Sequence, residues 1–328
     1  MQNRIKPDYF PLTNGKYEVK PGLHRFPCNF GNGESDRLIF QLDDEFEHYR
    51  RQKMASRAES LPKYYGTDGI TTSTSQVINR FIVQRLLTEH PQIFTLQKNR
   101  HHQILACNHS GDSLVFDNNH ILLDAENRSP ISPVYQDGLD ALAGQIQEDI
   151  AVVNLSQTGL DQLTAIHLCF PNHWAAREKL GRNFTSVHAP VPGMAKINHG
   201  ISRIMDAILN KGPFVRFAWG LATDRELNHH PEPAPVTDRK VWHGRRFDPA
   251  HPELYLRIER QTLHGFPADS AILFTIRTYF TDVLTLRYQP EKLQHLVSAV
   301  QSMGPDSLLY KGLQTDYPAI LGWVNSLL

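Results

Sequence analysis

The chain has few cysteines, no excess charge of either sign and no long apolar run. Its 328 residues include three Cys, 34 Lys and Arg against 34 Asp and Glu, and 40% hydrophobic side chains. Cys28, Cys107 and Cys169 lie far apart without any CxxC spacing, so neither a disulfide framework nor a zinc knuckle is expected. Balanced charge gives no general attraction for nucleic acid. We therefore expect a cytoplasmic globular protein that does not bind nucleic acid.

Signals for membranes and secretion are also lacking. The N-terminal residues contain no apolar run of signal-peptide length. No window approaches the roughly 20 apolar residues that a membrane-spanning helix requires. We therefore expect no membrane attachment.

Several common catalytic motifs are absent as well. The sequence has no GxGxxG after a predicted strand, no GxxxxGK[ST], no HExxH and no GxSxG. Each of these motifs supplies groups that its chemistry needs, namely phosphate-binding amides, zinc ligands or a nucleophile. Their absence argues against nucleotide-binding, zinc-protease and α/β-hydrolase functions.

Histidine, by contrast, is plentiful, with 17 residues, which indicates metal or cofactor ligation. His188 lies in VHAPVPG, where two prolines stiffen the backbone and suit a ring that needs a fixed orientation. A single histidine leaves a zinc ion under-coordinated, but it is enough for haem. An ordinary loop histidine remains the alternative. The other histidines in loop-like contexts are expected at the surface, namely His101, His102, His173, His229 and His230.

Residues 1–148 are predicted to form an N-terminal region of an irregular arm, helices and a small β hairpin set. The first thirty-odd residues are rich in Pro, Gly and Asn, which favours the arm. The helices are predicted from the placement of charges and from apolar residues at three- and four-residue spacing. The strands are predicted from short apolar runs. The expected helices are 43–58, 73–89 and 135–147, and the expected strands are 103–106, 113–116 and 120–123.

Residues 149–285 are predicted to form the core, and 286–328 a C-terminal helical extension packed on it. The expected core elements, in order, are strands 149–155 and 162–170, a short helix near 173–182, a helix 195–209, and strands 214–221, 253–263 and 271–281. This order is that of a PAS domain. We therefore predict an α+β fold with a PAS-like five-stranded antiparallel sheet and a ligand pocket under its helices. Residues 228–252 are expected to be a long loop.

Arg216 and Glu259 are candidate catalytic residues because each is a charged residue within a predicted strand that also carries apolar residues. Arg216 alternates with Phe217 and Trp219, so it lies on the opposite face from them, where a guanidinium could bind dioxygen or an anion. A solvated arginine is equally consistent with the pattern. Glu259 could receive a substrate ammonium or accept a proton, although a cross-strand ion pair with Arg277 is the commoner explanation.

The last predicted strand has one polar face that is consistent with ligand contact. Thr275, Arg277 and Tyr279 share this face. We therefore include Arg277 and Tyr279, with Arg216, His188 and Trp219, among the candidate cofactor-binding residues.

Six motifs occur in a fixed order along the second half of the chain: CFPNHW, EKLGR, VHAPVPG, VRFAW, RIERQTL and ILFTIRTYF. This series resembles the family of the haem-dependent oxidative N-demethylase α subunit, over roughly residues 41–281 and most strongly after 149. The chain departs from the family pattern at Ala218, where Asn is common, and at His264-Gly265, where an arginine or similar residue is common.

The resemblance implies a PAS core that binds haem b and oxidises a small, dimethylamine-like methylated amine with O₂ to the demethylated amine and formaldehyde. It implies NADPH electrons delivered through an FMN and 2Fe–2S reductase subunit, and an associated folate-binding subunit. By the same resemblance, His188 is the axial haem ligand, Arg216 lies beside bound oxygen and Glu259 lies near the amine. The chain has no cysteine set for an iron–sulfur cluster, so the reductase must be a separate protein.

Two functions without turnover remain as alternatives. One is a PAS sensor of haem or a small molecule, in which Arg216 reports ligand binding. No kinase, cyclase or DNA-binding segment that would give such a sensor an output is evident. The other is an assembly subunit that has lost haem.

Overall fold

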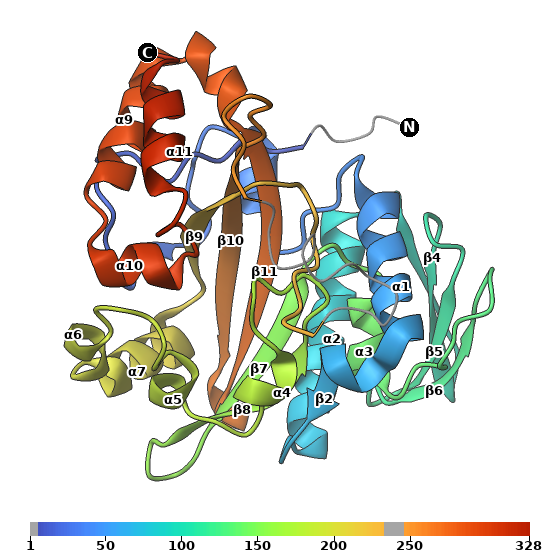
Figure 1. Cartoon of the computed structure of the whole chain (residues 1–328). Coiled ribbons are helices and arrows are strands. Elements are labelled where there is room, and N and C mark those ends of the chain that lie inside the picture. Colours follow the sequence, from blue (N-terminus) through green and yellow to red (C-terminus); the bar gives the residue numbers. More distant parts are fainter. Residues whose placement is uncertain (1–5, 233–245) are drawn as a thin grey trace.

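A computed structural model describes residues 6–232 and 246–328 of the chain. It is an α+β structure with a seven-stranded antiparallel sheet, a four-stranded antiparallel sheet and several helices, as Figure 1 shows. The predicted α+β class is confirmed. Most of the loop expected at 228–252 lies outside the described residues. In the part of the chain that is described, no helix is long and apolar enough to cross a membrane.

The large sheet has the strand order β1-β9-β10-β11-β7-β8-β2. All five strands predicted for the core are present and lie next to one another in this sheet. The sheet has seven strands, however, so the prediction of a five-stranded sheet was wrong. Two very short strands from the N-terminal region add to the two edges: His24 of β1 is paired with Val215, and Tyr65 of β2 with His167. Strands of two or three residues have no detectable periodicity, yet they cover edge groups that would otherwise lack partners. The bounds are β1 His24–Arg25, β2 Tyr65–Thr67, β7 Asp149–Leu155, β8 Asp161–His167, β9 Phe214–Ala222, β10 Tyr255–Phe266 and β11 Ala271–Asp282.

The N-terminal region contains three helices and the four-stranded sheet. All three predicted strands of this region are present, and a fourth, β3, precedes them. The predicted helices are present as well, although the third is shorter than expected. The bounds are α1 Phe46–Tyr64, α2 Thr72–Glu89, α3 Gly138–Ala143, β3 Phe94–Lys98, β4 His102–Cys107, β5 Ser113–Asp117 and β6 Leu122–Glu126.

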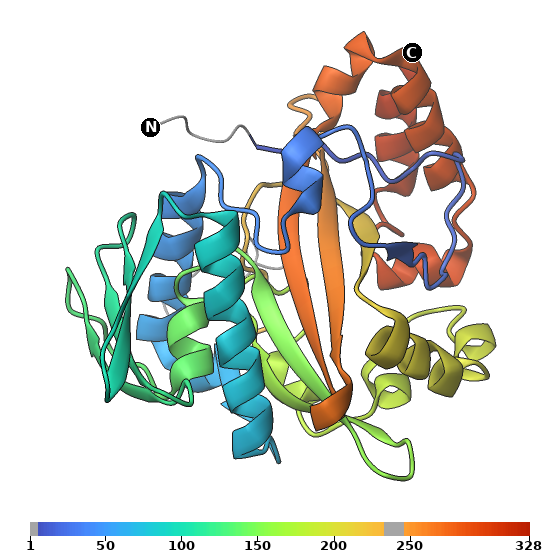
Figure 2. The ribbon, with the colours of Figure 1, turned by 180° about the vertical axis from the view of Figure 1, so that it is seen from behind.

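Short helices follow β8, and the C-terminal helices follow β11. The helix predicted at 195–209 is divided at His199-Gly200 into α6 and α7. In Figure 1 the C-terminal helices and the α5–α7 group lie to the left of the long strands, and α1–α3 and the small sheet lie to the right. Figure 2 shows the same arrangement from behind. The bounds are α4 Ala176–Lys179, α5 Phe184–Val187, α6 Ala195–Asn198, α7 Ile201–Lys211, α9 Pro290–Gln301, α10 Pro305–Tyr310 and α11 Tyr317–Asn325, with 3₁₀ turns at Gly33–Arg37, Pro267–Asp269 and Val283–Tyr288.

The two faces of the large sheet have different partners. Ile150 and Leu273 belong to the core that includes α1–α3, and Ile258 belongs to the core that includes α9 and α11. Ile150, Leu273 and Ile258 share one face of the sheet, which we call the far face. Ile272, next to Leu273 and on the other face, packs against Ile208 of α7. We call this second surface the near face.

Buried arginines attach the N-terminal region to the far face. The Arg277 guanidinium is fully buried, with Nη2 2.8 Å from Oδ2 of Asp43 and Cζ 3.8 Å from the centroid of the Tyr49 ring. Nη2 of Arg260 donates to the Leu38 carbonyl at 2.8 Å. A buried guanidinium needs such partners, because desolvating an unpaired charge is costly. These contacts fix residues 38–49 against β10 and β11.

Removing Asp43 is expected to destabilise the fold. Asp43→Ala leaves the Arg277 guanidinium buried without its counter-charge, and breaking a buried ion pair in this way costs about 3–5 kcal/mol. Urea denaturation followed by circular dichroism should show this loss as a lower midpoint. The control is Glu34→Ala, which removes an exposed carboxylate 4.0 Å from Arg37 and should leave the midpoint unchanged. Equal midpoints for the two variants would contradict the prediction.

Candidate functional site

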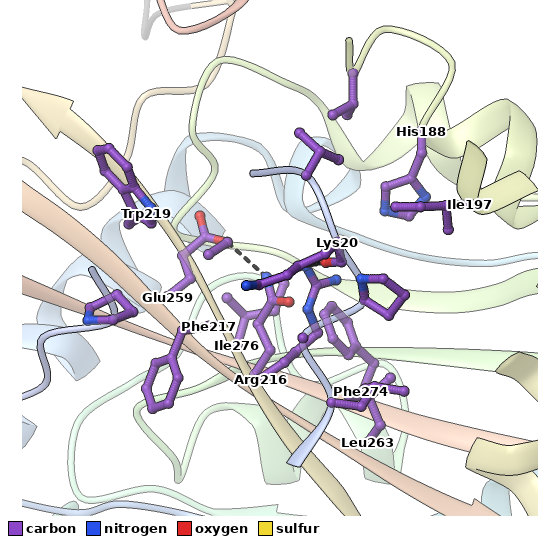
Figure 3. Close-up of a pocket in the computed structure, with 18 of the residues that line it drawn as sticks. Lys20, His188, Ile197, Arg216, Phe217, Trp219, Glu259, Leu263, Phe274 and Ile276 are labelled. Atoms are coloured by element: carbon purple, nitrogen blue, oxygen red, sulfur yellow. Dashed lines mark hydrogen bonds between the residues drawn. The ribbon is translucent and has the colours of Figure 1, made fainter. Parts of the chain in front are cut away.

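A cavity of about 950 Å³ lies against the near face of the large sheet. Its walls come from strands β7 to β11, helices α5–α7, the N-terminal arm and the end of α10. In Figure 3, His188 and Ile197 lie on the helical side, Arg216, Glu259, Leu263, Phe274 and Ile276 lie on the strands, and Lys20 of the arm lies between them in this view. The volume is near the upper end of the roughly 300–1,000 Å³ usual for ligand and cofactor pockets.

His188 is held at the end of α5 with one ring nitrogen already engaged. Asn183 caps this helix, since its side chain accepts from the Ser186 amide at 2.9 Å. Nδ1 of His188 lies 2.9 Å from the Phe184 carbonyl, and the two rings pack with centroids 4.0 Å apart. A carbonyl oxygen only accepts, so Nδ1 carries the hydrogen and Nε2 keeps its lone pair. This is the arrangement that a metal-ligating histidine requires.

The electrostatic surroundings keep the His188 ring neutral. Burial lowers the pKa of His188, and the positive charge of Arg216 lowers it further. The ring is therefore uncharged near neutral pH, with Nε2 able to act as a ligand. Arg216 and His188 line the same cavity.

Arg216 has unused hydrogen-bonding capacity in the cavity. Its Nη2 donates to the Lys20 carbonyl at 3.5 Å, whereas its Nε is buried without an acceptor. Burial lowers its pKa, and Glu259 partly offsets this. An orphaned buried donor is costly unless a ligand supplies an acceptor. The site is therefore suited to an anionic or strongly polar group beside Arg216.

Glu259 lies on the same face as Arg216, one strand away. In the β9–β10 register Glu259 is opposite Ala218, and Arg216 is opposite Gln261. The Gln261 amide donates to the Glu259 carboxylate at 3.0 Å. The expected pairing of Glu259 with Arg277 does not occur, because Glu259 is opposite Thr278 and its side chain is on the other face from Arg277. Its carboxylate lines the cavity instead.

The structure does not bring Arg277 and Tyr279 to the cavity. Both lie on the far face, where Arg277 binds Asp43 and the Tyr279 hydroxyl is hydrogen-bonded to the Gln41 side chain. The polar face of β11 is thus buried against the N-terminal region, and the apolar face of Phe274 and Ile276 lines the cavity. We leave Arg277 and Tyr279 out of the proposed site.

Trp219 lines the cavity from β9, beyond the two residues of this strand that pair with β1. Its ring is packed edge-on against Tyr17 of the arm, with centroids 5.7 Å apart. Its backbone carbonyl accepts from Nζ of Lys311 at 2.8 Å. Trp219 therefore contributes to the rim of the cavity.

Sequence reasoning missed the residues that the two ends of the chain contribute to the cavity. Lys20, Tyr17, Tyr310 and Lys311 line it, although no local pattern distinguishes them from surface residues. Gln261 could have been found, since it lies two residues from Glu259 on the same strand face.

The two departures from the family pattern have different positions. Ala218 lines the cavity opposite Glu259, so a larger residue there would occupy space beside this carboxylate. His264 and Gly265 do not line it. A Cβ at Gly265 would lie 2.1 Å from the Leu209 carbonyl oxygen, so glycine allows α7 to pack against β10.

A second polar cluster includes Asp149, which also lines the cavity. Asp149, His167 and Cys169 are buried, with ligand-type atoms within 4.8 Å of one another. Both Asp149 oxygens already accept from backbone amides, of Cys169 and Phe170, at 2.8 Å. Burial also raises the pKa of the Cys169 thiol. The cluster therefore has protein partners of its own, and we assign no metal to it.

Two of the histidines expected at the surface are buried instead. His229 is 4% exposed and His230 is fully buried, so the prediction was wrong for this pair. His101 and His173 are exposed as expected. The buried pair lies outside the cavity lining.

A comparison with models of protein families shows to which family the chain belongs. A family model described as "Haem-dependent oxidative N-demethylase, alpha subunit-like" matches residues 33–321. The match covers most of the chain, which therefore belongs to this family. The resemblance recognised from the six motifs is confirmed, and it extends beyond residues 41–281 at both ends.

Replacing Arg216 is expected to raise the pKa of His188. Arg216→Met removes a nearby positive charge that disfavours protonation of the ring. An NMR pH titration of ¹⁵N-histidine-labelled protein should therefore show His188 protonating at a higher pH in the variant than in the wild type. Arg203→Met, which removes an exposed charge from α7, is the control. The same His188 pKa in wild type and Arg216→Met would show that the two groups are not coupled.

Proposed function

We propose that the protein is a haem-dependent oxidative N-demethylase. It oxidises a small methylated amine, such as dimethylamine, with O₂ to the demethylated amine and formaldehyde. The observation that carries this proposal is the His188 imidazole, whose Nε2 lone pair is free beside a large cavity that also contains Arg216 and Glu259. Family membership supports haem dependence and N-demethylation.

The residues of the cavity fit a haem group. His188 supplies the single protein ligand that haem requires, and its Nδ1–H bond to Phe184 fixes the ring. Apolar side chains from both sides of the cavity suit the macrocycle, among them Ile197, Phe274 and Ile276. The sequence has no CxxCH motif for covalent attachment, so we propose haem b.

We further propose that residues 149–285 form a PAS-like haem-binding core. Strands β8-β7-β11-β10-β9 are contiguous and antiparallel, and helices α4–α7 lie between β8 and β9 in the chain. The N-terminal region, 1–148, and the C-terminal extension, 286–328, then complete the edges and the cavity of this core.

Bound haem would supply the reductive activation of O₂. Arg216 would offer hydrogen bonds and a positive charge to dioxygen, or to negative charge that develops beside it. Glu259 accepts hydrogen bonds from the substrate ammonium, orients the N-methyl group and holds a proton at its carboxylate. The arm around Lys20 covers the cavity and limits the access of water.

Electrons must come from outside this chain. We propose NADPH as the donor, through a reductase with FMN and a 2Fe–2S cluster, and a folate-binding subunit as a further partner. The three cysteines cannot hold a cluster, since Cys107 and Cys169 are buried and lie in different cores. Turnover consumes an electron pair and two protons, and it leaves one oxygen atom in formaldehyde and the other in water. A cytoplasmic location fits these partners.

Removing the His188 ring is expected to abolish specific haem binding. The purified wild-type protein, reconstituted with haem, should show a Soret band shifted from that of free haem, and His188→Ala should lose this shift. The matched control is His199→Ala, because His199 has the same Nδ1 contact to a backbone carbonyl, at 2.7 Å, but is exposed and does not line the cavity. An unchanged Soret band in His188→Ala would remove His188 as the ligand.

Neutralising Glu259 is expected to weaken the use of amines. Glu259→Gln removes the negative charge from the group that binds the substrate ammonium. A charge-assisted hydrogen bond is worth about 1.5–3 kcal/mol, so kcat/KM should fall by about 10- to 100-fold. The measurement is amine-dependent formaldehyde release with a surrogate reductase. Glu291→Gln, an exposed change on α9, should not alter it. No formaldehyde from wild type with any of a panel of methylated amines would favour a sensor or assembly role instead.

A further inference from the structure

A lysine from the C-terminal extension completes the end of the cavity near Glu259. Lys311 directly follows α10, and its Nζ donates to the Trp219 carbonyl at 2.8 Å. Nζ also lies 6.0 Å from the ring centroid of Tyr17 and 5.7 Å from that of Tyr310. An ammonium group has three hydrogens to donate, so two remain for a ligand. The demethylation chemistry described above gives this lysine no role.

Lys311 and Glu259 line the same cavity without forming an ion pair. Burial lowers the pKa of Lys311, and the Glu259 carboxylate opposes this, so the two charges interact. Within the described residues, neither side chain has an ion-pair partner within 4.0 Å. A cation and a carboxylate held apart in this way are complementary to a ligand that carries both charges.

We propose that the substrate is an N-methylated amino acid, whose ammonium binds Glu259 and whose carboxylate binds Lys311. This inference rests on the proposed function, because it specifies which amine Glu259 receives. Tyr310 is 44% exposed and also lines the cavity, so it lies at an opening through which such a ligand can enter. The rings of Tyr17 and Tyr310 provide walls for its apolar part.

The balance of the reaction is unchanged by the carboxylate. The N-methyl carbon is oxidised and leaves as formaldehyde with one oxygen atom of O₂, while the nitrogen keeps a hydrogen in place of the methyl group. The second oxygen atom leaves as water, with the electron pair from the reductase and two protons from solvent. The carboxylate only binds.

A haem propionate is the other carboxylate that Lys311 could bind. Geometry favours the substrate, because the Trp219 carbonyl that holds Lys311 follows Ala218, which is opposite Glu259 in the β9–β10 register. A haem propionate and a substrate carboxylate would give different results in binding experiments. A propionate contact affects haem affinity for every ligand alike, whereas a substrate contact affects only ligands that carry a carboxylate.

The test compares two probes that differ at one group. N-methylglycine and N-methylethylamine share the N-methyl ammonium, but only the first has a carboxylate. Isothermal titration calorimetry on the purified full-length protein, with and without haem, measures both dissociation constants. We expect the wild type to prefer N-methylglycine by at least about 10-fold, as one charge-assisted hydrogen bond provides. Lys311→Met should abolish this preference and leave N-methylethylamine binding within about threefold of its wild-type value.

Two further variants control for folding and for general charge. Lys311→Arg retains the cation and should retain a preference for N-methylglycine. Lys196→Met removes an exposed lysine of α6 outside the cavity lining and should change nothing. Equal binding of the two probes to wild type, or an equal loss of both in Lys311→Met, overturns the proposal. Weaker haem binding in Lys311→Met with an unchanged probe preference also overturns it, in favour of the propionate.

Failure of the proposed function would be recognised separately. Binding of the probes is measured without turnover, so it does not depend on the reductase. If the probe preference and its loss in Lys311→Met are observed but no formaldehyde is released, the binding site stands and the N-demethylase assignment fails. If formaldehyde is released from N-methylethylamine as readily as from N-methylglycine, the substrate inference fails and the N-demethylase assignment stands.

Discussion

The side-chain alternation along β9, β10 and β11 is the constraint on which the site depends. Arg216 and Glu259 share the near face because Ala218 is opposite Glu259 and Arg216 is opposite Gln261. Such diagonal neighbours lie about 7–8 Å apart, which leaves room for a small ligand to contact both. A slip of one residue in β10 would turn Glu259 to the far face and bring Arg260 into the cavity. The chemistry of the site therefore requires a register that does not slip.

The far face supplies that register through its buried cations. Arg260 reaches the Leu38 carbonyl and Arg277 reaches Asp43, and both arginines are almost completely buried. Lys53 of α1 is buried as well and donates to the carbonyls of Ala143 and Glu148. These contacts form in this alignment of the N-terminal region with the sheet, and a shift would separate the buried charges from them. Residues 38–53 thus help to position Arg216 and Glu259 from the far face, whereas Lys20 of the arm contacts Arg216 directly.

The sequence patterns were sufficient to predict strands and the residues that share a strand face. They were not sufficient to predict which segments of the chain pack against each face. The strand 149–155 was predicted with the bounds that β7 has, and the shared face of Arg216 and Ala218 was predicted correctly. A period of two shows which residues share a face but not which face meets the ligand, so the polar face of Arg277 was assigned to the wrong side. Edge strand β1 and the cavity residue Lys311 had no local signal, because their positions depend on distant segments of the chain.

The cavity is composite, and its parts have different origins in the chain. His188 and Arg216 come from the segment after β8 and from β9, so both side chains belong to residues 149–285. Lys311 and Tyr310 come from the C-terminal extension and line the same cavity as Glu259, which is opposite the small Ala218. Among the described residues, Lys311 contacts the Trp219 carbonyl and the rings of Tyr17 and Tyr310, none of which belongs to the helices around His188. The C-terminal extension thus supplies one wall of a cavity whose strands and helices come from residues 149–285, and on the proposals above a change in the extension alone would alter which amine is accepted.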